Sequence, residues 1–132
     1  MKKPLLLVLV FLSEEHRALV SERFEMIYAP NEGLGKDRSN GQAQIATRGQ
    51  DIRVVLTNGT NGLLAEEIDA LPNLELICTV GVGFENVARD RASERGIPVC
   101  NAAGTNDDAV ADHAVAILLA AIRRLPVLNS GV

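Results

Sequence analysis

Runs of mostly apolar residues alternate along the chain with stretches that are mostly polar and charged. The apolar runs lie at residues 5–12, 24–29, 52–57, 74–80 and 97–101. Near-continuous apolar runs of this length are typical of strands that are covered on both faces. We therefore expect five strands of a parallel sheet.

The polar stretches between these runs favour helices. The predicted helices are residues 14–23, 42–48, 63–71 and 86–95. Ser13 is expected to cap the first helix, and Gly96 to end the fourth in a left-handed conformation. Residues 31–41 and 58–62 have the composition of loops. This alternation predicts an α/β fold, a flavodoxin-like sheet of order 2-1-3-4-5 with helices on both faces.

In such a sheet the loops at the carboxyl ends of the strands are expected to carry the binding site. These loops are residues 13–15, 58–62, 81–86 and 102–107.

The last predicted helix has an unusual composition. It should begin after Thr105 or Asn106, either of which could cap it, and run to about Arg124. Its middle, A-V-A-I-L-L-A-A-I, is apolar on every side, which is typical of a helix that is buried all round. We expect a second chain or a further domain to cover it. The alternative is that the helix fills the core of its own domain.

The composition narrows the possible functions. The chain is 47% hydrophobic and 23% charged, as in globular proteins, and its net charge is −4 with no basic run beyond Arg123-Arg124. This argues against nucleic acid or an anionic membrane as the main partner. The N-terminal M-K-K-P-L-L-L-V-L-V-F-L resembles a secretory signal, but no small-residue cleavage site follows, which favours a strand. No apolar run approaches the ~20 residues of a membrane span.

The remaining candidate side chains favour structural roles. Cys78 and Cys100 are far apart in sequence, form no C-x-x-C motif and lie in apolar runs, so we expect buried free thiols in a reducing, cytoplasmic compartment. No group of residues has metal-ligand spacing. We expect His16 to be solvated and His113 to be a packed helix residue.

The stretch C-T-V-G-V-G-F-E-N-V-A at residues 78–88 resembles the start of a dinucleotide-binding fingerprint, but it is incomplete. Asn86 stands where the third glycine should be, and no acidic residue ends the next strand at residues 97–101. Gly81 and Gly83 could simply allow a tight turn. They could also expose successive backbone N–H groups that hold a small anion. The spacing alone leaves both interpretations open.

Three segments together resemble a known family. They are L-P-N-L-E-L-I-C-T-V-G-V-G-F-E-N-V, R-G-I-P-V-C-N and G-T-N-D-D-A-V-A-D-H-A-V-A-I-L-L-A-A-I-R-R-L-P. Their order and spacing resemble those of the D-isomer-specific 2-hydroxyacid dehydrogenases, nearest to the hydroxypyruvate and hydroxyphenylpyruvate reductase branch. The resemblance covers residues 54–126 well and the first 50 residues only in layout. It implies hydride transfer between NAD or NADP and a small 2-oxo or 2-hydroxy acid.

The resemblance also implies a domain plan. Residues 1–104 would be a flavodoxin-like substrate-binding domain, residues 105–126 an interdomain helix that also forms a homodimer, and residues 127–132 the entry to a Rossmann domain that this sequence lacks. The family's catalytic Arg, Glu and His would lie further downstream. This sequence is therefore expected to hold no catalytic residue and to be inactive alone.

Candidate contacts follow from the matching positions. The resemblance implies that the backbone N–H groups of Gly81, Val82 and Gly83 hold the substrate carboxylate. It places a further substrate contact at Asn58 and Gly59. It also places Asn106 near the nicotinamide and substrate, and Val110 against the cofactor.

The sequence departs from the family at a few positions and leaves other functions open. Glu85 and Ala88 stand where relatives usually or often carry Asp, which puts the capping of the turn in doubt, and Asp112 replaces the commoner Glu. A flavodoxin-like flavin carrier is an alternative, but T-N-G-T-N-G at residues 57–62 follows the wrong strand for its phosphate loop. A receiver domain would need an Asp where Thr57 and Asn58 stand. A dimerisation module without catalysis remains open.

Overall fold

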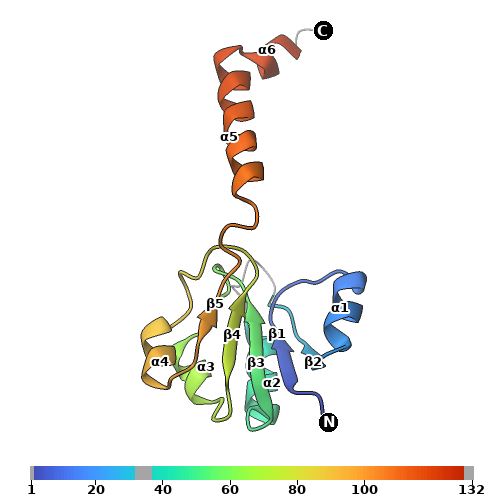
Figure 1. Ribbon diagram of the computed structural model, residues 1–132, viewed down its shortest axis with the longest axis vertical. Helices are drawn as coiled ribbons and strands as arrows, with labels where there is room; N and C mark the ends of the chain where they lie inside the picture. The colour runs from blue at the N-terminus through green and yellow to red at the C-terminus, as the bar shows by residue number, and fades with distance from the viewer. Residues whose placement is uncertain (1, 32–36, 130–132) are drawn as a thin grey trace. The chain divides into compact units, whose positions relative to one another are not determined.

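The structure, a computed structural model, describes residues 2–31 and 37–129; residues 32–36 of the predicted loop 31–41 lie outside the described residues. All five strands run parallel in the order β2-β1-β3-β4-β5 (Figure 1), so the predicted flavodoxin-like order is confirmed. The strands are β1 (Leu5–Val8), β2 (Glu25–Tyr28), β3 (Ile52–Thr57), β4 (Leu76–Thr79) and β5 (Val99–Cys100).

The described helices are α1 (Glu14–Ser21), α2 (Ser39–Arg48), α3 (Ala65–Asp69), α4 (Arg89–Glu94), α5 (Asp107–Ile122) and α6 (Leu125–Asn129). Ser13 caps α1 as predicted, because its hydroxyl accepts a hydrogen bond from the His16 N–H at 3.3 Å. None of these helices has the length and apolar character needed to cross a membrane.

Several predicted boundaries are wrong, each for a tertiary reason. β1 ends at Val8 rather than at residue 12. Leu9 and Val10 are still buried, so the apolar run extends past the strand because these two residues also pack in the core. α4 begins at Arg89 rather than at residue 86. The Asn86 carbonyl accepts a hydrogen bond from Leu63, and the next residue forms an isolated parallel bridge to Leu63.

The last predicted helix is also shorter and capped differently. α5 ends at Ile122, and Arg124 takes a left-handed conformation with φ 53° before α6 begins. Pro126 follows closely and has no N–H to continue the helix. Asn106 occupies the N-cap position but makes no side-chain capping bond, so a side-chain cap by Asn106 is wrong.

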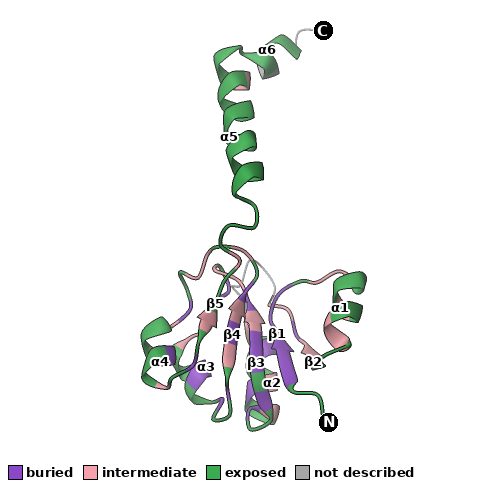
Figure 2. Cartoon of the chain, in the orientation of Figure 1, coloured by how far each residue is buried: buried purple, intermediate pink, exposed green. Residues whose placement is uncertain are grey.

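Helices cover both faces of the sheet, as predicted, but unequally. On one face Ile45 of α2, Ile68 of α3 and Ala92 of α4 join a core with Leu7 and Ile77. The other face has a smaller core around Leu6, Val8, Val10 and Val54, and of the helices in this part of the chain only α1 packs on it, through Val20. Figure 2 shows the buried residues concentrated in β1, β3 and the segments beside them.

The chain divides into two compact units, Met1–Ala102 and Ala103–Val132. The first contains the sheet and both cores. In the second, none of the residues of α5 is buried; Ile117 and Leu118, for example, are 56% and 58% exposed. The described residues of this unit, one helix followed by one short helix, form no core of their own.

Candidate functional site

Two of the predicted site loops lie side by side at the carboxyl ends of neighbouring strands. Residues 58–62 follow β3 and residues 81–86 follow β4, and the two strands pair directly. Asn86 links the loops, since its N–H donates to the Gly59 carbonyl at 3.3 Å and its side-chain Nδ2 donates to the Thr60 carbonyl at 2.9 Å. Strand order thus joins two segments that are distant in sequence.

The first loop is held in shape by hydrogen bonds among its own polar groups. The Asn58 carboxamide oxygen accepts a hydrogen bond from the Asn61 N–H at 2.6 Å, and the buried Thr57 hydroxyl donates to the Gly62 carbonyl at 2.7 Å. Asn61 is buried and donates from Nδ2 to the Leu9 carbonyl at 2.8 Å. The side-chain oxygen of Asn58, a predicted substrate contact, is therefore already engaged in the turn.

Glycines permit the close approach of the two loops. A Cβ placed on Gly59 would lie only 2.7 Å from the carbonyl carbon of Gly83, a distance that real Cβ atoms essentially never show. Gly81 is needed for its backbone conformation rather than for space. Its φ of 102° is one that residues with a side chain rarely adopt, whereas a Cβ there would meet nothing within 4 Å.

The first three residues of the second loop leave their N–H groups free. The carbonyls of Gly81 and Val82 accept hydrogen bonds from the Ala102 N–H and from Asn101 Nδ2, both at 2.8 Å. Within the described part of the chain, the N–H groups of Gly81, Val82 and Gly83 donate to no acceptor. Both glycines are half-buried, and Val82 is 44% exposed. The loop can therefore offer its backbone donors to a ligand.

A buried ion pair, which the sequence analysis missed, supports the first loop. Arg38, just before α2, donates from Nε to Glu67 Oε1 of α3 at 3.0 Å, and its other nitrogens bond Glu67 Oε2 and the Asn61 carbonyl. Glu67 Oε2 also accepts the Leu64 N–H at 2.8 Å. No local sequence pattern marks this pair, because its members are 29 residues apart in the chain.

A carboxylate also lies against the glycines. Glu85 is exposed, yet its Oε2 would be 2.4 Å from a Cβ on Gly59 and 2.6 Å from one on Gly83. Beside it, the Arg89 guanidinium stacks on the Phe84 ring at 4.5 Å from the ring centre. The site therefore has a resident negative charge close to its free N–H groups.

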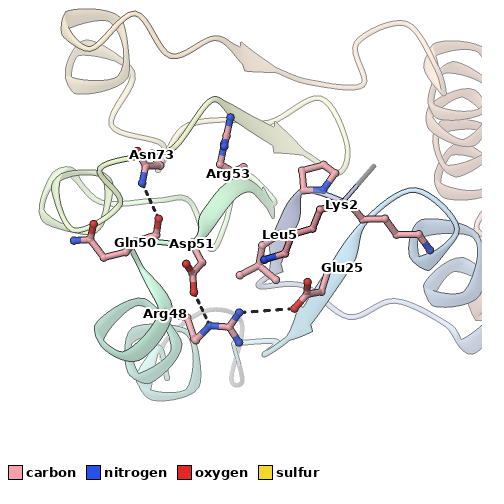
Figure 3. Close-up of a pocket in the computed structure, with 10 residues that line it drawn as sticks. Lys2, Leu5, Glu25, Arg48, Gln50, Asp51, Arg53 and Asn73 are labelled. Carbon is pink, nitrogen blue, oxygen red and sulfur yellow. Dashed lines mark hydrogen bonds and ion pairs between the residues drawn. The ribbon is translucent and has the colours of Figure 1, made fainter.

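Two of the cavities in the first unit differ in their distance from the two loops. One of about 300 Å³ borders them on the α3 side, between Arg38 and Glu85, and none of residues 81–83 lines it. Another, of about 370 Å³, opens at the amino ends of the strands (Figure 3), where Arg48 bonds Asp51 at 3.0 Å and Glu25 at 3.7 Å. This second cavity belongs to the end of the sheet away from the site loops.

The first unit does not fit a dinucleotide. Asn86 occupies the position of the third fingerprint glycine and is bonded to Thr60, while α4 spans only Arg89–Glu94. β5 ends at Cys100, followed by Asn101, so no acidic residue is there to bind a ribose. Among the described residues no three His, Cys, Asp or Glu side chains gather to hold a metal ion.

The remaining predicted site residues, Asn106 and Val110, belong to the second unit, where both are exposed. Their roles stay predictions.

Comparison with known proteins identifies the family. The family described as "D-isomer specific 2-hydroxyacid dehydrogenase, catalytic domain" matches residues 7–124. The chain is 38% identical over 81 residues to hydroxyphenylpyruvate reductase of Plectranthus scutellarioides, covering 61% of this chain and 26% of the relative. It is 47% identical over 62 residues to D-3-phosphoglycerate dehydrogenase of Archaeoglobus fulgidus, covering 47% of this chain and 12% of the relative.

Comparison of the fold with solved structures leads to the same family. The crystallised 2-hydroxyacid dehydrogenase from Ketogulonicigenium vulgare Y25 superposes with a TM-score of 0.77 at 33% identity, over 91% of this chain and 36% of that one. The chain thus spans about a quarter or less of the curated relatives named above, and about a third of this structure. On these matches, the chain belongs to the D-isomer specific 2-hydroxyacid dehydrogenases and corresponds to a fragment of their catalytic domain.

Proposed function

We propose that this chain is the substrate-binding part of an NAD(P)-dependent D-2-hydroxyacid dehydrogenase. In this proposal the N–H groups of Gly81, Val82 and Gly83 hold the carboxylate of a small 2-oxo or 2-hydroxy acid, and Asn58 and Gly59 provide a further contact. The observation that carries the proposal is that three successive N–H groups have no acceptor among the described residues, on an accessible loop at the carboxyl end of the sheet.

Hydrogen bonds from backbone N–H groups to a carboxylate are charge-assisted and stronger than neutral ones. Each is worth about 1.5–3 kcal/mol. A carboxylate held in this way fixes the position of the neighbouring carbonyl carbon, which accepts the hydride in this class of reaction. The chain's own contribution is thus binding and orientation.

The nicotinamide cofactor supplies the hydride when it is bound. Because the first unit lacks a dinucleotide site, we assign the cofactor mainly to another part of the whole protein, with Asn106 and Val110 contributing contacts from the second unit. We therefore expect the 132-residue chain alone to give no turnover with a 2-oxo acid and a reduced nicotinamide.

We also propose that the helical segment at residues 105–126 forms a homodimer. The middle of α5, residues 114–122, is apolar on every side, and none of the residues of α5 is buried. Leaving many aliphatic side chains in water is unfavourable by about 25 cal/mol per Å² of apolar surface. A second copy of the helix would cover part of that surface.

Binding can be tested by titrating the ¹⁵N-labelled chain with hydroxypyruvate and following the amide signals. We expect the amides of residues 81–83 to shift with a common dissociation constant. Val82→Pro removes one N–H and should weaken binding by about tenfold or more, the equivalent of one charge-assisted bond. Val82→Ala keeps the N–H and is the matched control.

Two results would contradict the proposal. One is a set of shifts confined to the cavity between Arg38 and Glu85, with the loop amides unmoved. The other is equal binding by Val82→Pro and Val82→Ala, with both variants shown to be folded by circular dichroism.

A further inference from the structure

The two cysteines, which the sequence predicts to be buried free thiols, are direct neighbours in the sheet. Cys78 of β4 is the register partner of Cys100 of β5, and the two strands run parallel. Adjacent strands lie about 4.8 Å apart. This spacing is within the roughly 4.4–6.8 Å that a disulfide allows between Cα atoms. Directly paired residues also project to the same face of the sheet.

The pair lies on the face that has less helical cover. Cys78 pairs on its other side with Leu56, which belongs to the smaller core, whereas α2, α3 and α4 pack on the opposite face. Both thiols are free; Cys78 is half-buried and Cys100 is exposed. The predicted burial of both cysteines is therefore wrong, because β5 is the edge strand and no described helix of the first unit packs over it on this side (Figure 2).

We propose that Cys78 and Cys100 form a thiol pair that closes reversibly to a disulfide across β4 and β5, with a small disulfide such as oxidised glutathione as the oxidant. This inference does not depend on the proposed function. The exposed Cys100 is the sulfur that a dissolved oxidant can reach, and Cys78 is the only other cysteine in the sequence.

The reaction has two steps. The Cys100 thiolate attacks one sulfur of oxidised glutathione, which forms a mixed disulfide and releases one glutathione thiolate. Cys78 then loses its proton to the solvent and attacks the Cys100 sulfur, which forms the protein disulfide and releases the second glutathione. In total the protein gives up two electrons and two protons, and oxidised glutathione takes them to become two thiols.

The two cysteines differ in their readiness to react. Burial, and to a lesser extent the negative charge of a Cys100 thiolate, raises the pKa of the Cys78 thiol. Cys78 therefore forms its thiolate less readily than an exposed cysteine does, so its attack relies on the second step being intramolecular, with the Cys100 sulfur on the neighbouring strand.

The disulfide would act on the glycine loop. The bond closes a ring of chain that contains residues 81–86, and the two residues after Cys100 hold the carbonyls of Gly81 and Val82. Both ends of the loop would then be anchored to one covalent link. The amide signals of residues 81–83 should change on oxidation.

The test treats the dilute 132-residue chain with oxidised glutathione at about pH 8, where thiolates form more readily. The intact mass should fall by two hydrogens, the free thiols should fall from two to none, and dithiothreitol should restore both. Cys78→Ser should stop at the mixed disulfide, with one glutathione on Cys100. Cys100→Ser should react at least about tenfold more slowly.

Other outcomes would overturn the proposal. A wild-type chain that keeps both thiols, or that ends with glutathione attached, lacks the intramolecular closure. A disulfide-linked dimer on a non-reducing gel would show that the cysteines react between chains instead. Each serine variant differs from cysteine by one atom, so its folding can be checked by its thermal midpoint.

Discussion

At the scale of single residues, the glycines of the site perform separate tasks. Gly81 supplies a left-handed backbone conformation, whereas Gly59 leaves room for the backbone of Gly83. The atoms nearest to a methyl group on Gly83 all belong to the end of the flexible Glu85 side chain, the closest at 2.6 Å. Replacing these glycines should therefore have unequal effects.

Gly59→Ala should destabilise the first unit by about 1–3 kcal/mol, because its Cβ overlaps backbone atoms that cannot move without shifting the loop. Gly83→Ala should cost less than about 1 kcal/mol, because Glu85 can rotate away. Urea denaturation of the two variants measures the difference. Equal losses would mean that the loops do not touch as described.

Glu85 places a negative charge next to the proposed carboxylate site. Glu85→Gln should therefore tighten the binding of hydroxypyruvate, by a factor of about two to five, since the charge is exposed and screened by water and salt. The effect should shrink as the salt concentration rises. Weaker binding by Glu85→Gln would show instead that the carboxylate of Glu85 helps the ligand to bind.

At the scale of elements, the first site loop is bonded to a largely buried ion pair between Arg38, which precedes α2, and Glu67 of α3. The side chains of Arg38 and Glu67 are only 16% and 6% exposed, and together they bond the Asn61 carbonyl and the Leu64 N–H. Removing one member of such a pair leaves an uncompensated charge in the interior. The pair therefore ties α2 and α3 to the first site loop.

Glu67→Leu should destabilise the chain by about 3–5 kcal/mol, whereas Arg38→Met together with Glu67→Leu should recover much of that loss, since no buried charge remains. Chemical denaturation of the single and double variants tests this. If the double variant is as unstable as the single one, the hydrogen bonds of the pair to the backbone matter more than its charges.

At the scale of the whole molecule, the chain combines a unit that has a core with a unit whose described residues form none. The sheet and its helices bury two clusters of aliphatic side chains, whereas none of the residues of α5 is buried. The free energy of α5 therefore depends on what covers it.

Analytical ultracentrifugation should show that the chain associates as its concentration rises. Leu118→Lys, which places a charge on α5, should weaken association by at least about tenfold, because an unpaired charge is costly to bury. Leu19→Lys on α1 is the matched control, since Leu19 is 55% exposed and Leu118 is 58% exposed. A wild-type chain that stays monomeric at all concentrations would contradict the proposed homodimer.

Much of the fold could be predicted from local pattern. The apolar runs and the polar stretches between them placed the strands and four of the helices, because a parallel strand must be apolar on both faces and a helix needs capping and end signals. Boundaries such as the start of α4 could not be predicted, because a bond from Leu63 to Asn86 decides them. The spacing of the glycine loop left a tight turn and a set of exposed N–H donors equally open, and the hydrogen bonds of the structure are what leave the N–H groups of residues 81–83 without an acceptor among the described residues.

The sequence by itself therefore determined the α/β alternation and the loops that end the strands, since each depends on residues close together in the chain. The sheet order was expected from that alternation because it is a common order of α/β folds. Only the tertiary structure decided which distant residues meet: Gly59 with Gly83, Arg38 with Glu67, and Cys78 with Cys100. These contacts depend on strand register and on the packing of helices, to which every part of the core contributes, and no short stretch of sequence records them.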